Sequence, residues 1–156
     1  PRLLLRTWSH DYIEPIAAIS QDPVVMEFFP ELQDRTVIEN LFQRVQGHQA
    51  QYGYSLYAVE RKQDNVIIGF TGLFRPSFEA AFTPAVEIGW RLAVKYWGQG
   101  YATEAARAAL HVGFEQCNLP EVVSFTTEHN LRSRRVMEKI GLQHDPADDF
   151  LHPSLP

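Results

Sequence analysis

The segment from Val86 to Cys117 changes from a strand pattern to a helix pattern across a short loop that contains Gly98 and Gly100. Before the loop the side chains alternate. One face carries Val86, Ile88, Trp90, Leu92 and Val94, and the other carries Glu87, Gly89, Arg91 and Ala93. After the loop, mostly small residues form a helical stripe that fits against a sheet: Ala102, Ala105, Ala106, Ala109, Leu110, Gly113, Phe114 and Cys117. Free backbone N–H groups at such a helix start suit an anion, and phosphate above all.

The rest of the chain supplies further strands and helices, with no repeat or linker, so we expect one domain over residues 1–156. Strand patterns cover residues 2–8, 54–60, 66–74 and 121–127, and the middle two form a hairpin. Ser9 or Asp11 is expected to cap a first short helix with Pro15 in its opening turn. Asp34 and Asn130 are expected to cap two more helices, which end at Gly53 and Gly141. The order β-α-α-β-β-β-α-β-α predicts an α/β fold with a mixed sheet and helices on both faces.

Composition excludes several classes of protein. Hydrophobic residues make up 45% and charged residues 21% of the 156 residues, which is ordinary for a globular domain. A net charge of −5 argues against non-specific nucleic-acid binding. No apolar run approaches the ~18 residues of a membrane span, so we expect no membrane partner and a cytoplasmic protein. The lone Cys117 cannot form an internal disulfide, and its place on the small-residue stripe predicts an inert buried thiol.

The glycine loop has several candidate ligands. A P-loop needs Lys-Ser/Thr after its second glycine, where this chain has Tyr101-Ala102. A dinucleotide fingerprint needs a third glycine or alanine where Thr103 stands, and Glu121 falls at the wrong end of the next strand for the ribose carboxylate. The pyrophosphate of coenzyme A is the third candidate, and a tight connector without a ligand is the remaining alternative.

Two motifs carry a resemblance to a known family. "KYWGQGYATEA" resembles motif A of the GNAT acetyltransferases, Gln/Arg-x-x-Gly-x-Gly/Ala, with Lys95, Gly98 and Gly100 at the motif positions. "NLRSRRVMEKIGL" is similar to the last-helix signature of the branch that includes ribosomal-protein N-terminal acetyltransferases, and the opening strand and "MEFFP" also match that branch. The resemblance implies the GNAT fold, whose mixed sheet splays apart at its centre and carries a final C-terminal strand.

The resemblance implies acetyl-CoA as co-substrate. The strand ending at Val94 would offer unpaired backbone groups to the pantetheine arm, and the loop amides would receive the pyrophosphate. The resemblance gives Asn130 two competing roles, as helix cap and as a pantetheine ligand, and an arginine of the last helix such as Arg135 would pair with the 3′-phosphate. The cofactor-binding residues implied are Leu92, Ala93, Val94, Lys95, Trp97, Gly98, Gln99, Gly100, Tyr101, Ala102, Thr103, Asn130 and Arg135.

Glu87 and Ser133 are the catalytic residues that the resemblance implies. An amine must lose a proton before it attacks a thioester, and a partly buried carboxylate such as Glu87 suits that task. The alternative is a solvated or ion-paired strand residue. Ser133 would protonate the departing CoA thiolate, since the last helix has no tyrosine; the alternative is an ordinary first-turn serine.

The predicted function is acetyl-CoA-dependent N-acetyl transfer to a primary amine, either a protein N-terminus or a small amine. A non-catalytic acyl-CoA-binding sensor is the alternative. Phe28 and Phe29 are adjacent, so one is expected to pack inward while the other lines the acceptor pocket; an irregular loop that buries both is the alternative. We expect no metal, because the loop containing His144 and Asp149 fixes no ligand geometry.

The chain has no clear strand after Gly141, although the family closes with one. An unpaired sheet edge is a liability. We therefore expect the native polypeptide to continue past Pro156, or a partner chain, as in a homodimer, to cover the edge. The absence of an initial methionine similarly predicts that residues precede Pro1.

Overall fold

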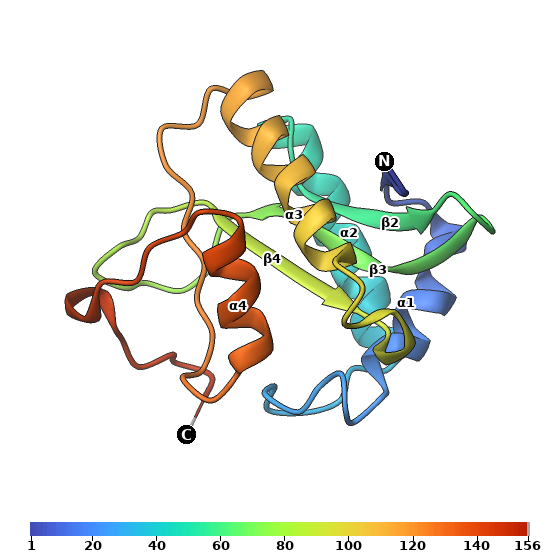
Figure 1. Cartoon of the computed structure of the whole chain (residues 1–156), viewed down its shortest axis with the longest axis horizontal. Helices are drawn as coiled ribbons and strands as arrows, with labels where there is room; N and C mark the ends of the chain where they lie inside the picture. Colours follow the sequence, from blue (N-terminus) through green and yellow to red (C-terminus); the bar gives the residue numbers. More distant parts are fainter. Residues whose placement is uncertain (156) are drawn as a thin grey trace.

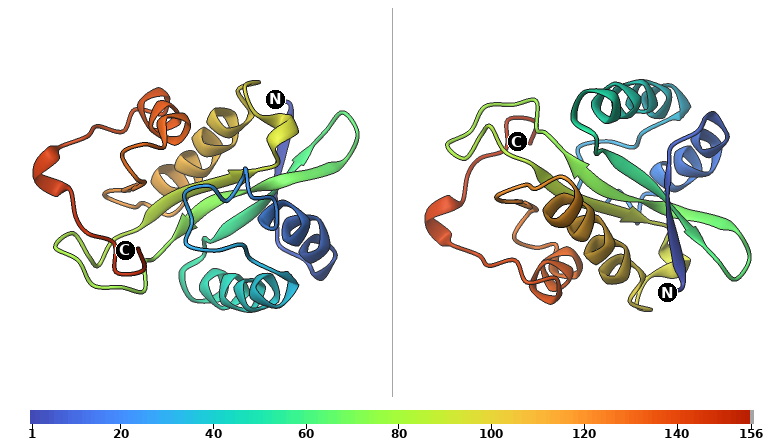
Figure 2. Two further views of the ribbon diagram at one scale, coloured as in Figure 1. Left: turned by 90° about the horizontal axis from the view of Figure 1, so that it is seen from below. Right: turned by 90° about the horizontal axis from the view of Figure 1, so that it is seen from above.

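A computed structural model describes residues 1–155, which form a four-stranded antiparallel sheet between two layers of helices (Figure 1). The strands lie in the order β1 (Leu3–Thr7), β2 (Leu56–Arg61), β3 (Val66–Phe74) and β4 (Glu87–Leu92). Helices α1 (Ile13–Ser20) and α2 (Arg35–Tyr52) cover one face, and α3 (Tyr101–His111) and α4 (Leu131–Lys139) lie on the other (Figure 2). Short 3₁₀ turns lie at His10–Tyr12, Val94–Tyr96 and Pro146–Asp148, and a π turn at Val112–Gln116. The predicted fold class is confirmed.

The predicted hairpin and helix ends are also present. Strands β2 and β3 pair directly, with Arg61 opposite Val66 at the turn. Asp34 accepts the Val37 N–H at 3.0 Å, and Gly53 ends α2 in the left-handed conformation at φ 81°. A glycine is the residue that adopts this conformation without a steric penalty.

Helix α4 has the predicted cap and the predicted stop. The Asn130 side chain accepts the Ser133 N–H at 3.3 Å. At the other end Gly141 has φ 95°, and its N–H and that of Leu142 return to the carbonyls of Glu138 and Met137. This pair of bonds closes the helix as a Schellman motif.

The start of α1 differs from the expectation. Neither Ser9 nor Asp11 caps it with a side chain; the Ser9 carbonyl accepts the Tyr12 N–H in a 3₁₀ turn that runs into α1. Pro15 lies in the first turn as predicted, because the missing N–H costs nothing there.

The strand predicted over residues 121–127 is wrong in extent. Only Val123 pairs with the sheet, as a single parallel bridge to Glu87, and the Ser124 hydroxyl then donates to the Ile88 carbonyl at 2.9 Å. The alternation in the sequence expresses local propensity, whereas a strand needs a partner along its length. Beyond this bridge the segment leaves β4, so within residues 1–155 the sheet is mixed only at this one point.

The predicted stripe on α3 is buried only in part. Ala105, Ala106 and Ala109 are almost fully buried against the sheet. A Cβ on Gly113 would lie 2.8 Å from a Leu73 methyl, so the glycine permits that approach. Phe114, however, is 41% exposed, and Cys117 is half-buried rather than in the core. The wider π turn changes the angle between successive side chains and rotates these residues off the face.

The C-terminal segment packs through aromatic rings. Phe78 and Phe82 of the β3–β4 loop, Phe125, Phe150 and His152 form one cluster, with centroid separations between 4.7 and 6.3 Å. This cluster ties residues 144–155 to the loop before β4, and the stretch from Gly141 to residue 155 contains no strand. The predicted continuation beyond Pro156 lies outside the described residues. None of the helices in residues 1–155 is both long and apolar enough to cross a bilayer.

Candidate active site

The glycine loop joins the end of β4 to the start of α3. Gly98 and Gly100 have φ values of 72° and 81°, a left-handed conformation that side-chain-bearing residues rarely adopt. A Cβ on Gly98 would meet nothing within 4 Å, and one on Gly100 would meet only the Arg2 guanidinium, at 3.4 Å. The glycines are therefore present for backbone conformation and for an unobstructed surface, not for close internal packing.

The backbone amides of this loop have no hydrogen-bond partner in the described part of the chain. The first bond into α3 is donated by Glu104 to the Gly100 carbonyl at 3.0 Å. Within residues 1–155, no acceptor takes the N–H groups of residues 98–103. Unpaired N–H groups at a helix start combine with the helix dipole to favour an anion. The loop thus fits a pyrophosphate, as the sequence predicts.

The open edge of β4, the side away from β3, is shorter than predicted. The strand ends at Leu92, and the Ala93 N–H donates to the Ile68 carbonyl of β3 at 2.9 Å. Ile88 instead donates outward to Val123 at 2.8 Å. Because the direction alternates, the backbone groups of Trp90 and Leu92 face the open edge. The Ala93 N–H is therefore not free at the open edge, contrary to the expectation for that residue, and Val94 lies beyond the end of β4 in a 3₁₀ turn. Trp90 faces the open edge, although it was not among the expected site residues.

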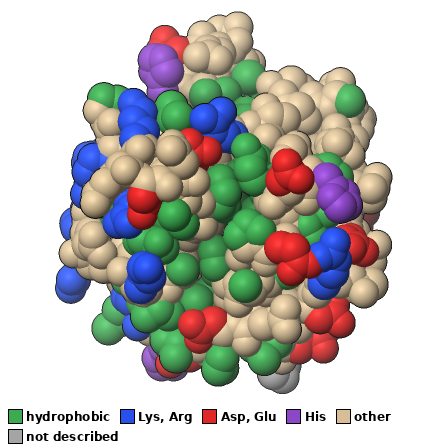
Figure 3. All heavy atoms as spheres, turned by 90° about the vertical axis from the view of Figure 1, so that its right-hand side faces the viewer, with side chains coloured by type: hydrophobic (Ala, Val, Ile, Leu, Met, Phe, Trp, Pro, Cys, Tyr) green, Lys and Arg blue, Asp and Glu red, His purple; other side chains and the backbone are tan. Residues whose placement is uncertain are grey.

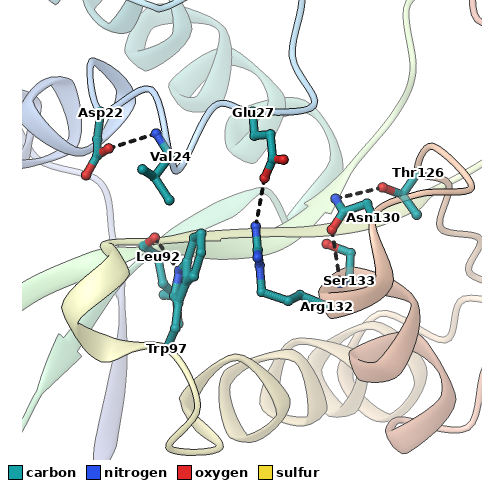
Figure 4. A network of polar contacts seen from close by, with 9 residues as sticks. All are labelled: Asp22, Val24, Glu27, Leu92, Trp97, Thr126, Asn130, Arg132 and Ser133. Carbon is teal, nitrogen blue, oxygen red and sulfur yellow. Dashed lines mark hydrogen bonds and ion pairs between the residues drawn. The ribbon is translucent and has the colours of Figure 1, made fainter.

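Residues of α4 face this edge across a narrow space (Figure 4). The Trp97 indole N–H donates to the Leu92 carbonyl at 2.9 Å, and the Arg132 guanidinium lies 4.2 Å from the Trp97 ring centre. Arg132 also contacts Glu27 at 3.2 Å, which joins α4 to the α1–α2 connection. Arg132 is one of the last-helix arginines considered for the 3′-phosphate, but its contacts with Glu27 and Trp97 were not expected, because only the fold brings these residues together.

Asn130 and Ser133 lie at the start of α4 on the same side as Arg132 (Figure 4). Both ends of the Asn130 amide are occupied, since Oδ1 accepts from the Ser133 N–H and Nδ2 donates to Thr126 Oγ1 at 3.0 Å. The Ser133 hydroxyl is half-buried and has no hydrogen-bond partner among residues 1–155. Arg135 is exposed on this helix.

Glu87 is the first residue of β4, beside the Val123 bridge. Its carboxylate has no hydrogen-bond or ion-pair partner in the part of the chain that the structure describes. Burial raises the pKa of Glu87 to about 8, because a desolvated carboxylate favours its neutral form. The carboxylate leans along the strand toward Gly89, with Oε1 3.8 Å from where a Gly89 Cβ would lie. Such a group can take up and release a proton near neutral pH.

The predicted aromatic pair divides between two environments. Phe28 is half-buried, whereas Phe29 is 43% exposed and its ring centre lies 4.7 Å from the Arg91 guanidinium carbon. Strand alternation placed Arg91 on the face of Glu87 but could not identify its partners.

Arg2 was also missed: its guanidinium donates to the Gln99 carbonyl at 2.8 Å, beside the glycine loop.

The remaining surface has an uneven distribution of charge and one open hollow. On the face turned to the viewer in Figure 3, apolar side chains run between a side with most of the basic residues and a side with most of the acidic ones. An open hollow of about 340 Å³ lies over α1 and α2, far from the glycine loop, and is lined in part by His10 and Glu39. Across residues 1–155, no group of three His, Cys, Asp or Glu is arranged to hold a metal ion.

Comparison with known proteins agrees with this geometry. The family described as Acetyltransferase (GNAT) domain matches residues 2–143. An uncharacterized protein of Bacillus subtilis, YkkB, is 33% identical over 79% of this chain and 70% of its own length. The uncharacterized N-acetyltransferase YnaD of the same species is 28% identical over 92% of this chain and 81% of its own.

Solved structures share the fold over most of the chain. An acetyltransferase from Agrobacterium tumefaciens superimposes with a TM-score of 0.84 at 27% identity, over 98% of this chain and 86% of its own. The ribosomal-protein-S5-alanine acetyltransferase of Vibrio fischeri has a TM-score of 0.72 at 18% identity, over 90% and 79% of the two chains. At that identity the likeness extends to the fold alone.

Proposed function

Because the chain belongs to the GNAT acetyltransferase family, we propose that it moves the acetyl group of acetyl-CoA directly to a primary amine, with Glu87 as the base. The chain is an N-acetyltransferase with acetyl-CoA as its co-substrate. The observation that carries the assignment of Glu87 is its desolvated carboxylate, which has no polar partner among residues 1–155 and lies beside the open edge of β4.

The residues that would hold acetyl-CoA follow from the free backbone groups. The amides of residues 98–103 would receive the pyrophosphate, since they are unpaired and surround two glycines. The outward backbone groups of Trp90 and Leu92 would pair with pantetheine. Because the Trp97 indole already donates to Leu92, we expect the Trp97 side chain to adjust on binding. Lys95 and Arg135 are exposed and can approach phosphates by charge.

The chemistry requires the amine to lose protons and the thiolate to receive one. When the acceptor arrives as an ammonium ion, the ionised Glu87 carboxylate takes its proton, and the resulting neutral amine attacks the thioester and releases a second proton to solvent as the N–C bond forms. The C–S bond then breaks, and the thiolate receives the proton of the free Ser133 hydroxyl, which solvent replaces. Direct transfer needs no protein nucleophile, and half-buried Cys117 takes no part in it.

The amine acceptor and the branch of the GNAT family are proposed from the α4 sequence and from the α1–α2 connection. The α4 sequence resembles that of ribosomal-protein N-terminal acetyltransferases, which favours a protein N-terminus; the fold is equally that of a spermidine N-acetyltransferase from Vibrio cholerae, 20% identical with a TM-score of 0.71 over 90% of this chain and 80% of its own. We propose that the acceptor binds between Glu87 and the α1–α2 connection, where Phe29 is exposed and Phe28 anchors the segment.

An acyl-CoA-binding sensor without catalysis is the competing function, and one experiment separates the two. Acetyl-CoA is incubated with the protein and a panel of amines, and thiol release is followed together with the mass of the acetylated product. An enzyme gives amine-dependent thiol with one acetyl group on the amine. Acetyl-CoA binding by calorimetry without amine-dependent thiol release would assign the chain to the sensor class.

A further inference from the structure

Arg91 is a buried cation that no carboxylate neutralises within residues 1–155. Its side chain is only 8% exposed, and Nη1 donates to Ser20 Oγ at 3.0 Å and to Gln33 Oε1 at 2.8 Å. The rings of Phe29 and Phe70 lie over its guanidinium, with centroids 4.7 and 4.9 Å from Cζ. Burial lowers the pKa of Arg91 to about 10, so the group keeps its charge at neutral pH.

The other edge of this guanidinium, made by Nε and Nη2, has no partner among the residues that the structure describes. Nε is fully buried and unpaired. The two rings satisfy the faces of the guanidinium but not the N–H groups in its plane, and leaving such a buried charged donor unpaired is costly. Elsewhere in this chain the same edge holds a carboxylate: Arg6 binds Glu60 through Nε and Nη2, at 2.7 and 3.2 Å, and Arg61 binds Asp64 in the same way. The free edge of Arg91 therefore has the form of a carboxylate site.

The free edge of the Arg91 guanidinium lies on the same side of β4 as Glu87, where the acceptor amine is proposed to bind. Arg91 and Glu87 project from the same face of β4, with Gly89 between them. A Cβ on Gly89 would have only the Glu87 carboxylate within 4 Å, so the surface between the two charged groups is bare. The ring over Arg91 belongs to Phe29, which is 43% exposed on the α1–α2 connection and can shift without opening the core.

We propose that Arg91 binds a carboxylate of the acceptor, so that the preferred acceptors are short peptides or long amino acids with a free amine at one end and a carboxylate at the other. This inference rests on the proposed function in taking Glu87 as the place of the amine. Glu87 and Arg91 are four residues apart on β4, or about 13 Å along the strand, and the gap between the charged groups is shorter because the Glu87 carboxylate leans toward Gly89. An extended tripeptide spans about 10 Å, whereas a single α-amino acid is too short to reach both.

The test compares acceptors that differ only in charge. Triglycine and triglycine amide present the same amine, and for wild type we expect kcat/KM to favour the acid by about tenfold to a hundredfold, the usual size of a charge-assisted contact. Arg91→Gln should bring this ratio close to one. Arg44→Gln, which alters an exposed arginine of α2, is the matched control and should keep the wild-type ratio. Glycine and glycinamide should show no comparable ratio, because glycine cannot span the site.

A second variant and a binding measurement keep the test decisive. If Arg91→Gln does not fold, Arg91→Lys keeps the charge but loses the forked geometry, and it should still lower the ratio. Calorimetric titration of triglycine and its amide into the CoA complex measures carboxylate binding without chemistry. Carboxylate-dependent binding that Arg91→Gln abolishes, in a protein that transfers no acetyl group, would refute the proposed function and leave this inference standing. Equal use of acid and amide by wild type, or an unchanged ratio in both Arg91 variants, would overturn it and leave Arg91 as a tether for the α1–α2 connection.

Discussion

Glu87 is a residue whose contribution to activity opposes its contribution to stability. Burial raises its pKa from 4.5 to about 8, so the folded protein holds the proton over a pH range in which the unfolded chain has released it. The favourable contribution is therefore fully present below about pH 4.5 and is lost as the pH rises through 8. The same desolvation that suits the carboxylate to its proposed role as a base thus destabilises the fold near neutral pH.

The first prediction concerns this stability. Glu87→Gln removes the ionisation but keeps the shape, so the variant should be more stable than wild type near pH 8 by about 1–4 kcal/mol. The difference should shrink toward pH 5, because the carboxyl of the unfolded chain, with a pKa of 4.5, then begins to hold the proton as well. Thermal unfolding of both proteins across this pH range measures it. Parallel curves for the two proteins would mean that the folded carboxylate titrates at an ordinary pKa.

The second prediction concerns Ser133. Its backbone N–H, not its hydroxyl, receives the Asn130 cap, so Ser133→Ala should leave the melting temperature and CoA affinity unchanged. The value of kcat should fall by about tenfold or less, because a thiolate with a pKa near ~8.5 departs tolerably without an acid. Asn130→Ala is the structural contrast and should cost about 1 kcal/mol of stability through the lost cap. Wild-type kcat in Ser133→Ala would exclude the hydroxyl as proton donor.

At the scale of elements, the connection from β4 to α3 depends on glycines that have little contact with the rest of the protein. Two glycines of this chain share φ 81°: Gly100 in this connection and Gly53 at the end of α2. They provide a matched pair, since an aspartate meets the same backbone strain at both positions but would meet the proposed pyrophosphate only at Gly100.

The third prediction uses this pair. Gly100→Asp should weaken acetyl-CoA binding by tenfold or more, roughly, since it adds a negative charge and bulk to the proposed pyrophosphate site. Gly53→Asp should lose similar stability but bind acetyl-CoA as wild type does. Calorimetry on both variants gives the affinities. Unaltered affinity in Gly100→Asp would place the pyrophosphate elsewhere.

Elements with their own start and stop signals were predictable, and elements defined by partners were not. Asp34 with Gly53, and Asn130 with Gly141, define α2 and α4 through bonds within a few residues of each other. Residues 121–127 alternate as a strand does, yet only Val123 pairs with β4. The local sequence does not indicate whether a neighbouring strand is there to pair with. In the proposed site, Glu87 was predicted from the family resemblance and the glycine loop from its motif. The contacts of Arg91 and Arg132 join segments more than fifty residues apart, which spacing cannot reveal.

At the scale of the whole molecule, His48 links α2 to the sheet and to the loop that follows β3. Its Nδ1 lies 2.8 Å from the Tyr54 carbonyl, and Nε2 accepts the Arg75 N–H at 3.1 Å. Nδ1 must therefore carry the proton of a neutral ring, which also stacks on Phe74 at 4.3 Å. Burial lowers the pKa of His48, since a charged imidazolium would be desolvated there.

The fourth prediction is a loss of stability in acid. Because the unfolded chain takes up the proton first, the contribution of His48 is complete above its ordinary pKa of 6.5 and is lost as the pH falls below that value. His48→Asn should be less stable than wild type at neutral pH, yet its unfolding free energy should change less between about pH 7 and pH 5. Urea denaturation at both pH values measures the slopes, and an undiminished slope in the variant would assign the acid loss to other groups.

The most direct test of the account is the pH dependence of kcat/KM for wild type and Glu87→Gln, with acetyl-CoA affinity measured in parallel. Wild-type kcat/KM should rise with pH until Glu87 is ionised, near 8. The variant should bind acetyl-CoA normally but lose about 10²–10⁴-fold in kcat at neutral pH. Its deficit should shrink at higher pH, where more of the acceptor amine is already neutral. Activity of Glu87→Gln within a few-fold of wild type at every pH would contradict the account and leave proximity of amine and thioester as the main source of rate.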